Sequence, residues 1–189
     1  VMALCALDMH ARGHLPGATI VATVMSNMGL EKALAPAGIR VERSQVGDRY
    51  VVEMLRANGW RFGGEQSGHL IFLDHATTGD GLVAAIEILN VMIARQRPLS
   101  ELAGVMTRYP QVLVNKRVKT KPPLGELPRV QAAIVSAESR LAGDGRVLVR
   151  YSGTEPKVRV MVEGADANVI RTLADDIVDA FAQDVGLDG

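Results

Sequence analysis

The sequence predicts an α/β domain followed by a small α+β domain. Three observations support this. Apolar strand-like runs alternate with helix-like segments in the first part of the chain, Tyr109-Pro110 interrupts the pattern, and the remainder reads strand, helix, two strands, helix. We therefore predict domains at residues 1–108 and 109–189. The first would have a mostly parallel or mixed sheet with helices on both faces, and the second an antiparallel sheet.

In the first domain, strands and helices are predicted to alternate. The predicted helices lie at 1–12, 28–37, 49–58, 81–95 and 100–107, and the predicted strands at 18–25, 39–46, 60–62 and 70–73. The run at 18–25 lacks polar alternation, which indicates a strand buried on both faces. The helix at 81–95 is apolar on nearly all sides, which predicts a central, buried helix.

The second domain is predicted to begin with a strand at 111–119 that has one wet face, since valines alternate there with lysines. A helix at 129–141 and a final helix at 167–184 flank two further strands. These strands, at 146–150 and 157–163, are separated by YSGTEP and are expected to pair like a hairpin.

Composition excludes several classes of function. The chain has 189 residues, 48% of them hydrophobic, and its 21 basic residues balance 21 acidic ones. A balanced charge argues against a general nucleic-acid binder. No apolar run reaches the ~18–20 residues that span a bilayer, and the start does not resemble a signal peptide. The single cysteine, Cys5, forms no internal disulfide, which fits the cytoplasm. Because Val1 stands within a helical pattern, we interpret the chain as a piece of a longer protein.

The stretch GGEQSGHLIFLDHATTGDG at 63–81 crowds polar groups between glycines around a short apolar run. Carboxylate and hydroxyl groups can each pair with a sugar hydroxyl, and glycine allows the backbone to approach a ligand closely. This composition suits a binding loop for a hydroxyl-rich ligand. It suits a plain hairpin loop with a glutamate on its rim equally well.

A second group of polar residues lies in RVLVRYSGTEPKVRV, residues 146–160. A strand delivers Arg150 to a turn that carries Ser152, Gly153 and Thr154, and the next strand brings Arg159 back. Hydroxyls, backbone N–H groups and flanking arginines together favour a phosphate. The alternative is a hairpin turn with arginines on its surface.

Two histidine-bearing segments are weaker candidates. His10 and His14 have a spacing that can hold a metal on a helix, but Gly13 breaks that helix and no third ligand is near, so no metal site is predicted. Asp74 and His75 follow a strand, where a helix-capping role is the better interpretation.

Five segments, taken in order, resemble the α-D-phosphohexomutase superfamily. They are TVMSNMGLE, VGDRYVVE, GGEQSGH, TTGDG and RYSGTEPKVRVMVEG, and the resemblance covers nearly the whole chain. The SNMGLE segment and Gln66 are more similar to members that act on glucosamine phosphates than to members that act on mannose or glucose phosphates.

The resemblance implies a parent of four domains. Residues 1–108 would be the third domain and residues 109–189 the fourth. The sheet of the fourth domain would resemble that of the TATA-binding protein. The phosphorylated serine and the aspartate-rich Mg²⁺ loop of that family belong to the missing N-terminal domains of the same polypeptide. The fragment alone is therefore expected to be inactive, with no metal ligands of its own. Tyr109-Pro110 would be a hinge that lets the fourth domain close as a lid.

The implied activity interconverts glucosamine 6-phosphate and glucosamine 1-phosphate through a phosphoserine and a hexosamine 1,6-bisphosphate, for UDP-N-acetylglucosamine synthesis. The resemblance assigns sugar binding to Glu65 and Ser67. It assigns phosphate binding to Arg150, Ser152, Gly153, Thr154 and Arg159. His69 falls near the reacting end, with proton transfer and a structural hydrogen bond both open. A mutase for mannose or glucose phosphates and a non-catalytic sugar-phosphate sensor remain alternatives. Expected partners are a phosphosugar and the missing domains, and neither nucleic acid nor a membrane.

Overall fold

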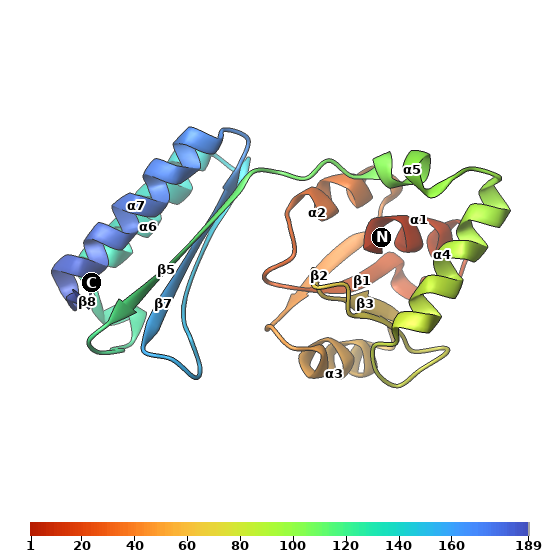
Figure 1. Ribbon diagram of the computed structural model, residues 1–189, viewed down its shortest axis with the longest axis horizontal. Helices are drawn as coiled ribbons and strands as arrows, with labels where there is room; N and C mark the ends of the chain where they lie inside the picture. Colours follow the sequence, from red (N-terminus) through yellow and green to blue (C-terminus); the bar gives the residue numbers. More distant parts are fainter. Residues whose placement is uncertain (189) are drawn as a thin grey trace. The chain divides into compact units, whose positions relative to one another are not determined.

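Each of two compact units carries its own sheet and its own apolar core (Figure 1). The computed structural model describes residues 1–188. Unit 1 comprises Val1–Arg108, and unit 2 begins at Tyr109.

Unit 1 contains a four-stranded mixed sheet in the order β2-β1-β3-β4. Its strands are β1 (Thr19–Thr23), β2 (Arg40–Ser44), β3 (Phe62–Gly64) and β4 (Leu70–Phe72). Its helices are α1 (Met2–Ala11), α2 (Gly29–Leu34), α3 (Asp48–Asn58), α4 (Gly81–Arg95) and α5 (Leu99–Leu102), with short 3₁₀ turns η1 (Pro16–Ala18), η2 (Ala35–Ala37) and η3 (Ala103–Val105). Strand β1 runs parallel to β2 and β3, and β4 is antiparallel to β3. The predicted mixed α/β sheet is confirmed.

Strand β1 is buried along its whole length, as its sequence predicts. Ile20 and Ala22 belong to the core beneath α1 and α2, whereas Val21 packs on the opposite face with Val51 and Leu55 of α3. Figure 1 shows α3 on one side of this sheet and α1 and α2 on the other. Because both faces are covered, every side chain of β1 is buried, which explains why its sequence shows no polar alternation.

The prediction that α4 is a central, buried helix is wrong. Only Ala84 and Val91 of this helix are buried, and several large aliphatic side chains face outward. An apolar composition shows that a helix has no polar face. It does not show whether each apolar face is covered by other elements of the same unit.

Strand β3 starts two residues later than predicted and includes Gly63 and Gly64. A Cβ at Gly63 would lie 2.4 Å from the carbonyl oxygen of Val21, and one at Gly64 would lie 2.6 Å from that of His69. These glycines therefore allow neighbouring strands to approach closely. The approach of a ligand to these glycines stays a prediction from the sequence.

Unit 2 contains an antiparallel sheet in the order β6-β7-β5-β8. Its elements are β5 (Gln111–Val118), η4 (Leu124–Glu126), α6 (Pro128–Leu141), β6 (Gly145–Tyr151), β7 (Lys157–Gly164), α7 (Ala167–Asp184) and β8 (Leu187–Asp188). The predicted antiparallel sheet and the pairing across YSGTEP are confirmed. The short β8 was not predicted, since two residues carry no periodic signal.

The two faces of the unit 2 sheet differ. Val158, Val160 and Val162 of β7 lie in the core with α6 and α7, which Figure 1 shows together on one side of the sheet. Alternate residues of β7 therefore point to the other face. Among the described residues of this unit, no helix covers that face. Within residues 1–188, no helix is both long and apolar enough to cross a membrane.

Candidate functional site

The loop between β3 and β4, residues 65–69, is a closed turn at the carboxyl end of β3. The N–H of Glu65 donates to the His69 carbonyl at 3.0 Å, and the N–H of Gly68 donates to the Glu65 carbonyl at 3.1 Å. Gly68 has φ +93°, a conformation that favours glycine. Carboxyl ends of parallel strands are the usual ligand edge of an α/β sheet.

The carboxylate of Glu65 is partly buried and is bound within the protein. Its Oε1 accepts a hydrogen bond from the N–H of Gly47 at 3.0 Å, at the start of α3. The second carboxylate oxygen has no hydrogen bond among those the structure describes. Ser67, by contrast, is exposed at the tip of the loop. Glu65 is thus a fixed acceptor and Ser67 an accessible hydroxyl.

The imidazole of His69 lies against the loop that precedes α4. A Cβ at Gly79 would lie 1.7 Å from Cδ2 of His69, so a larger residue there would displace this exposed ring. His69 Nε2 lies 3.7 Å from Oδ2 of Asp48, at the head of α3. Sequence reasoning named His69 but missed Gly79, whose role arises from the meeting of two separate segments.

Two further contacts hold the loops at this edge of the sheet. The hydroxyl of Thr23 donates to Oε1 of Gln66 at 3.1 Å, which joins the end of β1 to the 65–69 loop. Arg43 binds Glu31 through two bonds of 2.8 and 2.9 Å and donates to the carbonyls of Thr23 and Ser26. A planar, forked guanidinium suits this arrangement. Sequence reasoning missed Arg43, whose partners come from separate segments.

In unit 2, the strand register places two arginines opposite each other. Arg150 of β6 pairs with Arg159 of β7, and Asn115 of β5 lies on the far side of Arg159. Lys157 and Arg117 form the neighbouring cross-strand pair. Like charges placed directly opposite on a sheet are destabilising, so this arrangement favours an anion.

Burial strengthens the repulsion between Arg150 and Arg159. The Nε atoms of Arg150 and Arg159 are both buried and have no hydrogen-bond partner within the described part of the chain. Burial lowers the pKa of Arg150 below its ordinary value, and the positive charge of Arg159 lowers it further. A phosphate accepts bonds from guanidinium groups and supplies the missing negative charge.

The loop 152–156 is fastened by Ser152, which is buried. Its N–H donates to the Lys157 carbonyl at 2.8 Å, and its carbonyl accepts from Lys121 Nζ at 2.7 Å. Its hydroxyl accepts from the N–H of Glu155 at 3.3 Å. Gly153 and Thr154 are exposed. Gly153 has no positive φ, and its Cβ position is open, so within this unit the fold does not require glycine there.

Glu155 supplies a negative charge beside these cations. Its carboxylate lies 2.6 Å from Lys157 Nζ and 3.8 Å from Nη2 of Arg159. A hydrogen bond from Lys157, together with its charge and those of Arg159 and Arg117, lowers the pKa of Glu155. Sequence reasoning named neither Glu155 nor Lys121, because the loop pattern does not show which charges converge.

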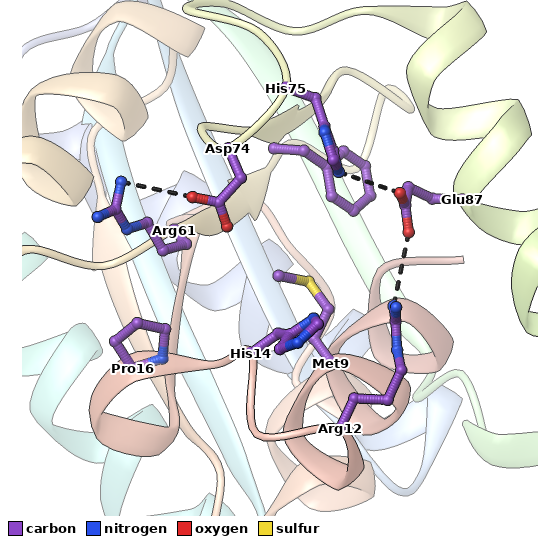
Figure 2. Close-up of a pocket in the computed structure, with 9 residues that line it drawn as sticks. Met9, Arg12, His14, Pro16, Arg61, Asp74, His75 and Glu87 are labelled. Carbon is purple, nitrogen blue, oxygen red and sulfur yellow. Dashed lines mark ion pairs between the residues drawn. The ribbon is translucent and has the colours of Figure 1, made fainter.

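A cavity of about 430 Å³ lies in unit 1 at the opposite end of β3 and β4 from the 65–69 loop (Figure 2). Its charged groups pair with one another. Arg61 lies 3.4 Å from Asp74, and Glu87 lies 3.1 Å from His75 and 3.6 Å from Arg12. The helix cap predicted for Asp74 and His75 is supplied by Asp80 instead. The cavity charges are thus already compensated.

Within the described part of the chain, the structure gives no support for a metal site. His14 lines the cavity, but within residues 1–188 no three histidine, cysteine or acidic side chains are grouped to hold a metal ion. The absence of metal ligands from the whole chain stays a prediction.

Comparison with known proteins gives the class. The model of phosphoglucomutase/phosphomannomutase α/β/α domain III matches residues 1–109, and that of the C-terminal domain matches residues 113–180. The chain belongs to the phosphoglucomutase/phosphomannomutase family.

Within this family, the chain is similar to a protein from Anaeromyxobacter dehalogenans named phosphoglucosamine mutase. The two are 57% identical over 186 residues, which cover 98% of this chain and 41% of that relative. A phosphoglucosamine mutase from Myxococcus xanthus is 55% identical over 97% of this chain and 40% of its own length. The chain thus spans about two fifths of the curated relatives that it matches.

The fold also resembles solved structures. A phosphoglucomutase/phosphomannomutase family protein from Burkholderia thailandensis has a TM-score of 0.74 and 21% identity, over 98% of this chain and 42% of that chain. An Aspergillus fumigatus N-acetylphosphoglucosamine mutase, solved with GlcNAc-6P and magnesium, has a TM-score of 0.71 and 22% identity, over 95% and 45%. At this identity the likeness concerns the fold.

Proposed function

We propose that this chain is the sugar-phosphate-binding half of a phosphoglucosamine mutase. The observation that carries the proposal is the opposed pair Arg150 and Arg159, whose buried Nε atoms lack partners among the described residues. A phosphate bound by both guanidinium groups would relieve their repulsion and accept their N–H bonds. The relatives named phosphoglucosamine mutase, 57% and 55% identical to this chain, support the choice of substrate.

The proposed reaction begins with a phosphoserine outside this chain. Its phosphoryl group passes to O1 of glucosamine 6-phosphate, which gives a 1,6-bisphosphate and a free serine hydroxyl. The 6-phosphoryl group then returns to the serine, and glucosamine 1-phosphate leaves, so that phosphate and charge balance over the cycle. Mg²⁺, bound by ligands outside this chain, would offset the charge of the transferring group. The product would supply UDP-N-acetylglucosamine synthesis in the cytoplasm.

The residues of this chain bind and orient the substrate in this proposal. Glu65 and Ser67 bind sugar hydroxyls, each bond contributing about 0.5–3 kcal/mol. Arg150 and Arg159 bind the phosphate that is not reacting. Ser152, Gly153 and Thr154 complete that binding loop, and His69 is the candidate proton carrier near the reacting end.

Phosphate titration of the chain tests the anion site. Calorimetry with inorganic phosphate and with glucosamine 6-phosphate should show binding that Arg150→Ala weakens by at least about tenfold. Arg171→Ala is the matched control, because Arg171 is an exposed arginine on α7. Equal affinities for the two variants would refute the site.

The mutase assignment is tested separately. The isolated chain should show no mutase activity, and measurable turnover from it would overturn the assignment. In the longer polypeptide, Arg150→Ala should raise KM and Glu65→Ala should lower kcat. A substrate panel that favours mannose or glucose phosphates would replace the proposed substrate. If the gene encodes neither a phosphoserine loop nor an aspartate-rich metal loop upstream of Val1, the mutase assignment is wrong. A non-catalytic sugar-phosphate sensor then takes its place.

A further inference from the structure

Helix α4 presents a continuous apolar stripe to solvent. Leu82, Ile86, Leu89 and Ile93 have exposed fractions of 78%, 57%, 53% and 74%. Their spacing of four, three and four residues places them on one face of the helix. These four side chains are called the α4 stripe below. Single exposed aliphatic residues are common on protein surfaces, whereas a contiguous row marks a surface that another body covers.

The exposure of the α4 stripe does not come from a loosely attached helix. On its other side, Val91 packs with Leu4 of α1 and with Leu102. Glu87 lies within ion-pair distance of Arg12 and His75, as Figure 2 shows. The helix is therefore fixed to unit 1 by its inner face, and the stripe faces outward in the folded unit.

We propose that the α4 stripe is the docking surface for the domain that precedes this one in full-length relatives. This inference rests on the proposed function, which places further domains upstream of Val1. The matched family models are domain III and the C-terminal domain, and the chain spans only 41% of the Anaeromyxobacter dehalogenans relative. Those relatives therefore contain a large body of protein that is outside this structure.

The path of the polypeptide favours the upstream domain over a separate protein as the body that covers the α4 stripe. Val1 stands at the start of α1, and Leu4, one turn into this helix, contacts Val91 of α4. Figure 1 shows α1 beside α4. A polypeptide that leads into α1 enters unit 1 at the helix on which the inner face of α4 packs. A covalently joined domain is therefore held near α4 at high effective concentration.

The test compares one double variant in two proteins. Leu82→Glu with Ile93→Glu replaces the two most exposed members of the stripe. In the 189-residue chain, the melting temperature should stay unchanged or rise, and binding of an apolar fluorescent dye should fall. In the natural polypeptide that includes the upstream domains, the same change should lower the melting temperature by at least about 3 °C.

Val135→Glu is the matched control. Val135 is an aliphatic residue of α6 with 60% exposure, and its replacement should leave both melting temperatures unchanged. An unchanged melting temperature for the double variant of the longer polypeptide overturns the proposal. Light scattering that finds the 189-residue chain dimeric, and its double variant monomeric, overturns it in favour of a second copy. The phosphate titration of Arg150 variants does not involve α4, so the two proposals fail independently.

Discussion

Arg150 of β6 lies directly opposite Arg159 of β7, and both side chains share the face of the sheet that α6 and α7 leave open. Two guanidinium groups in this position repel each other, and their Nε atoms are buried without partners in the described part of the chain. This repulsion destabilises the folded chain locally, and a bound anion would compensate the two positive charges.

Replacing either arginine should separate folding from binding. Arg150→Met or Arg159→Met removes the repulsion, so the free energy of unfolding without ligand should rise by about 0.2–1 kcal/mol. Added phosphate should then stabilise the variants less than the unchanged chain. Thermal melts with and without phosphate measure both effects. A variant that loses stability without ligand and keeps the full phosphate response would contradict this account.

Glu155 should act as an internal counter-ion that competes with phosphate. Because Glu155→Gln removes the charge beside Lys157 and Arg159, phosphate affinity should rise by about two- to tenfold. Calorimetry at neutral pH measures this change. Glu101→Gln is a suitable control, since Glu101 forms its own exposed pair with Arg97 in unit 1.

The carboxylate of Glu155 should also make the free energy of unfolding fall at acidic pH. The cations around Glu155 lower its pKa in the folded chain. Its ion pairs therefore stabilise the fold above the unfolded pKa of about 4.3, and this contribution is lost as pH falls through the lower folded pKa. Urea unfolding between pH 3 and 7 should show this acid-dependent loss in the unchanged chain, and less of it in Glu155→Gln.

Gly79→Ala should destabilise unit 1 by less than about 1 kcal/mol, because its methyl group would displace the exposed ring of His69 from its rotamer. Gly81→Ala is the matched control, since a Cβ at Gly81 meets nothing within 4 Å. Urea unfolding measures both changes. In the double variant His69→Ala with Gly79→Ala, most of the loss should disappear. A persistent loss would show that the ring is not the obstacle.

Cys5 should react slowly with thiol reagents in the folded chain. Burial raises its pKa to about 11, and the thiolate is the reactive form. A colorimetric disulfide reagent at pH 8 should modify Cys5 at least about tenfold more slowly in buffer than in denaturant. Equal rates in buffer and in denaturant would show that local unfolding of α1 readily exposes Cys5.

The mixed sheet, the antiparallel sheet and the pairing of β6 with β7 could be predicted from sequence, because alternation and turn residues are local signals. The fully buried β1 followed in the same way from a run that lacks polar alternation. The orientation of α4 could not be predicted. Periodicity records which residues avoid water, and it does not distinguish a core from a surface that another domain covers.

The contacts that shape the candidate loops were also beyond the sequence. The fit of Gly79 against His69 joins segments that neither motif links. Likewise, the pairing of Arg150 with Arg159 depends on strand register, which the length of the intervening loop leaves open. Local patterns thus named candidate residues, but not the groups that hold them.

Glu65 accepts a hydrogen bond from the backbone N–H of Gly47 within the fold of unit 1. Its side-chain rotation is therefore restricted before any sugar arrives, so binding would forfeit little torsional freedom at this residue. A rigid acceptor cannot swing to follow a hydroxyl of inverted configuration. Under the proposed function, Glu65 would make the loop sensitive to the stereochemistry of the ring, and selection among epimers would begin with the α3 backbone that fixes this carboxylate.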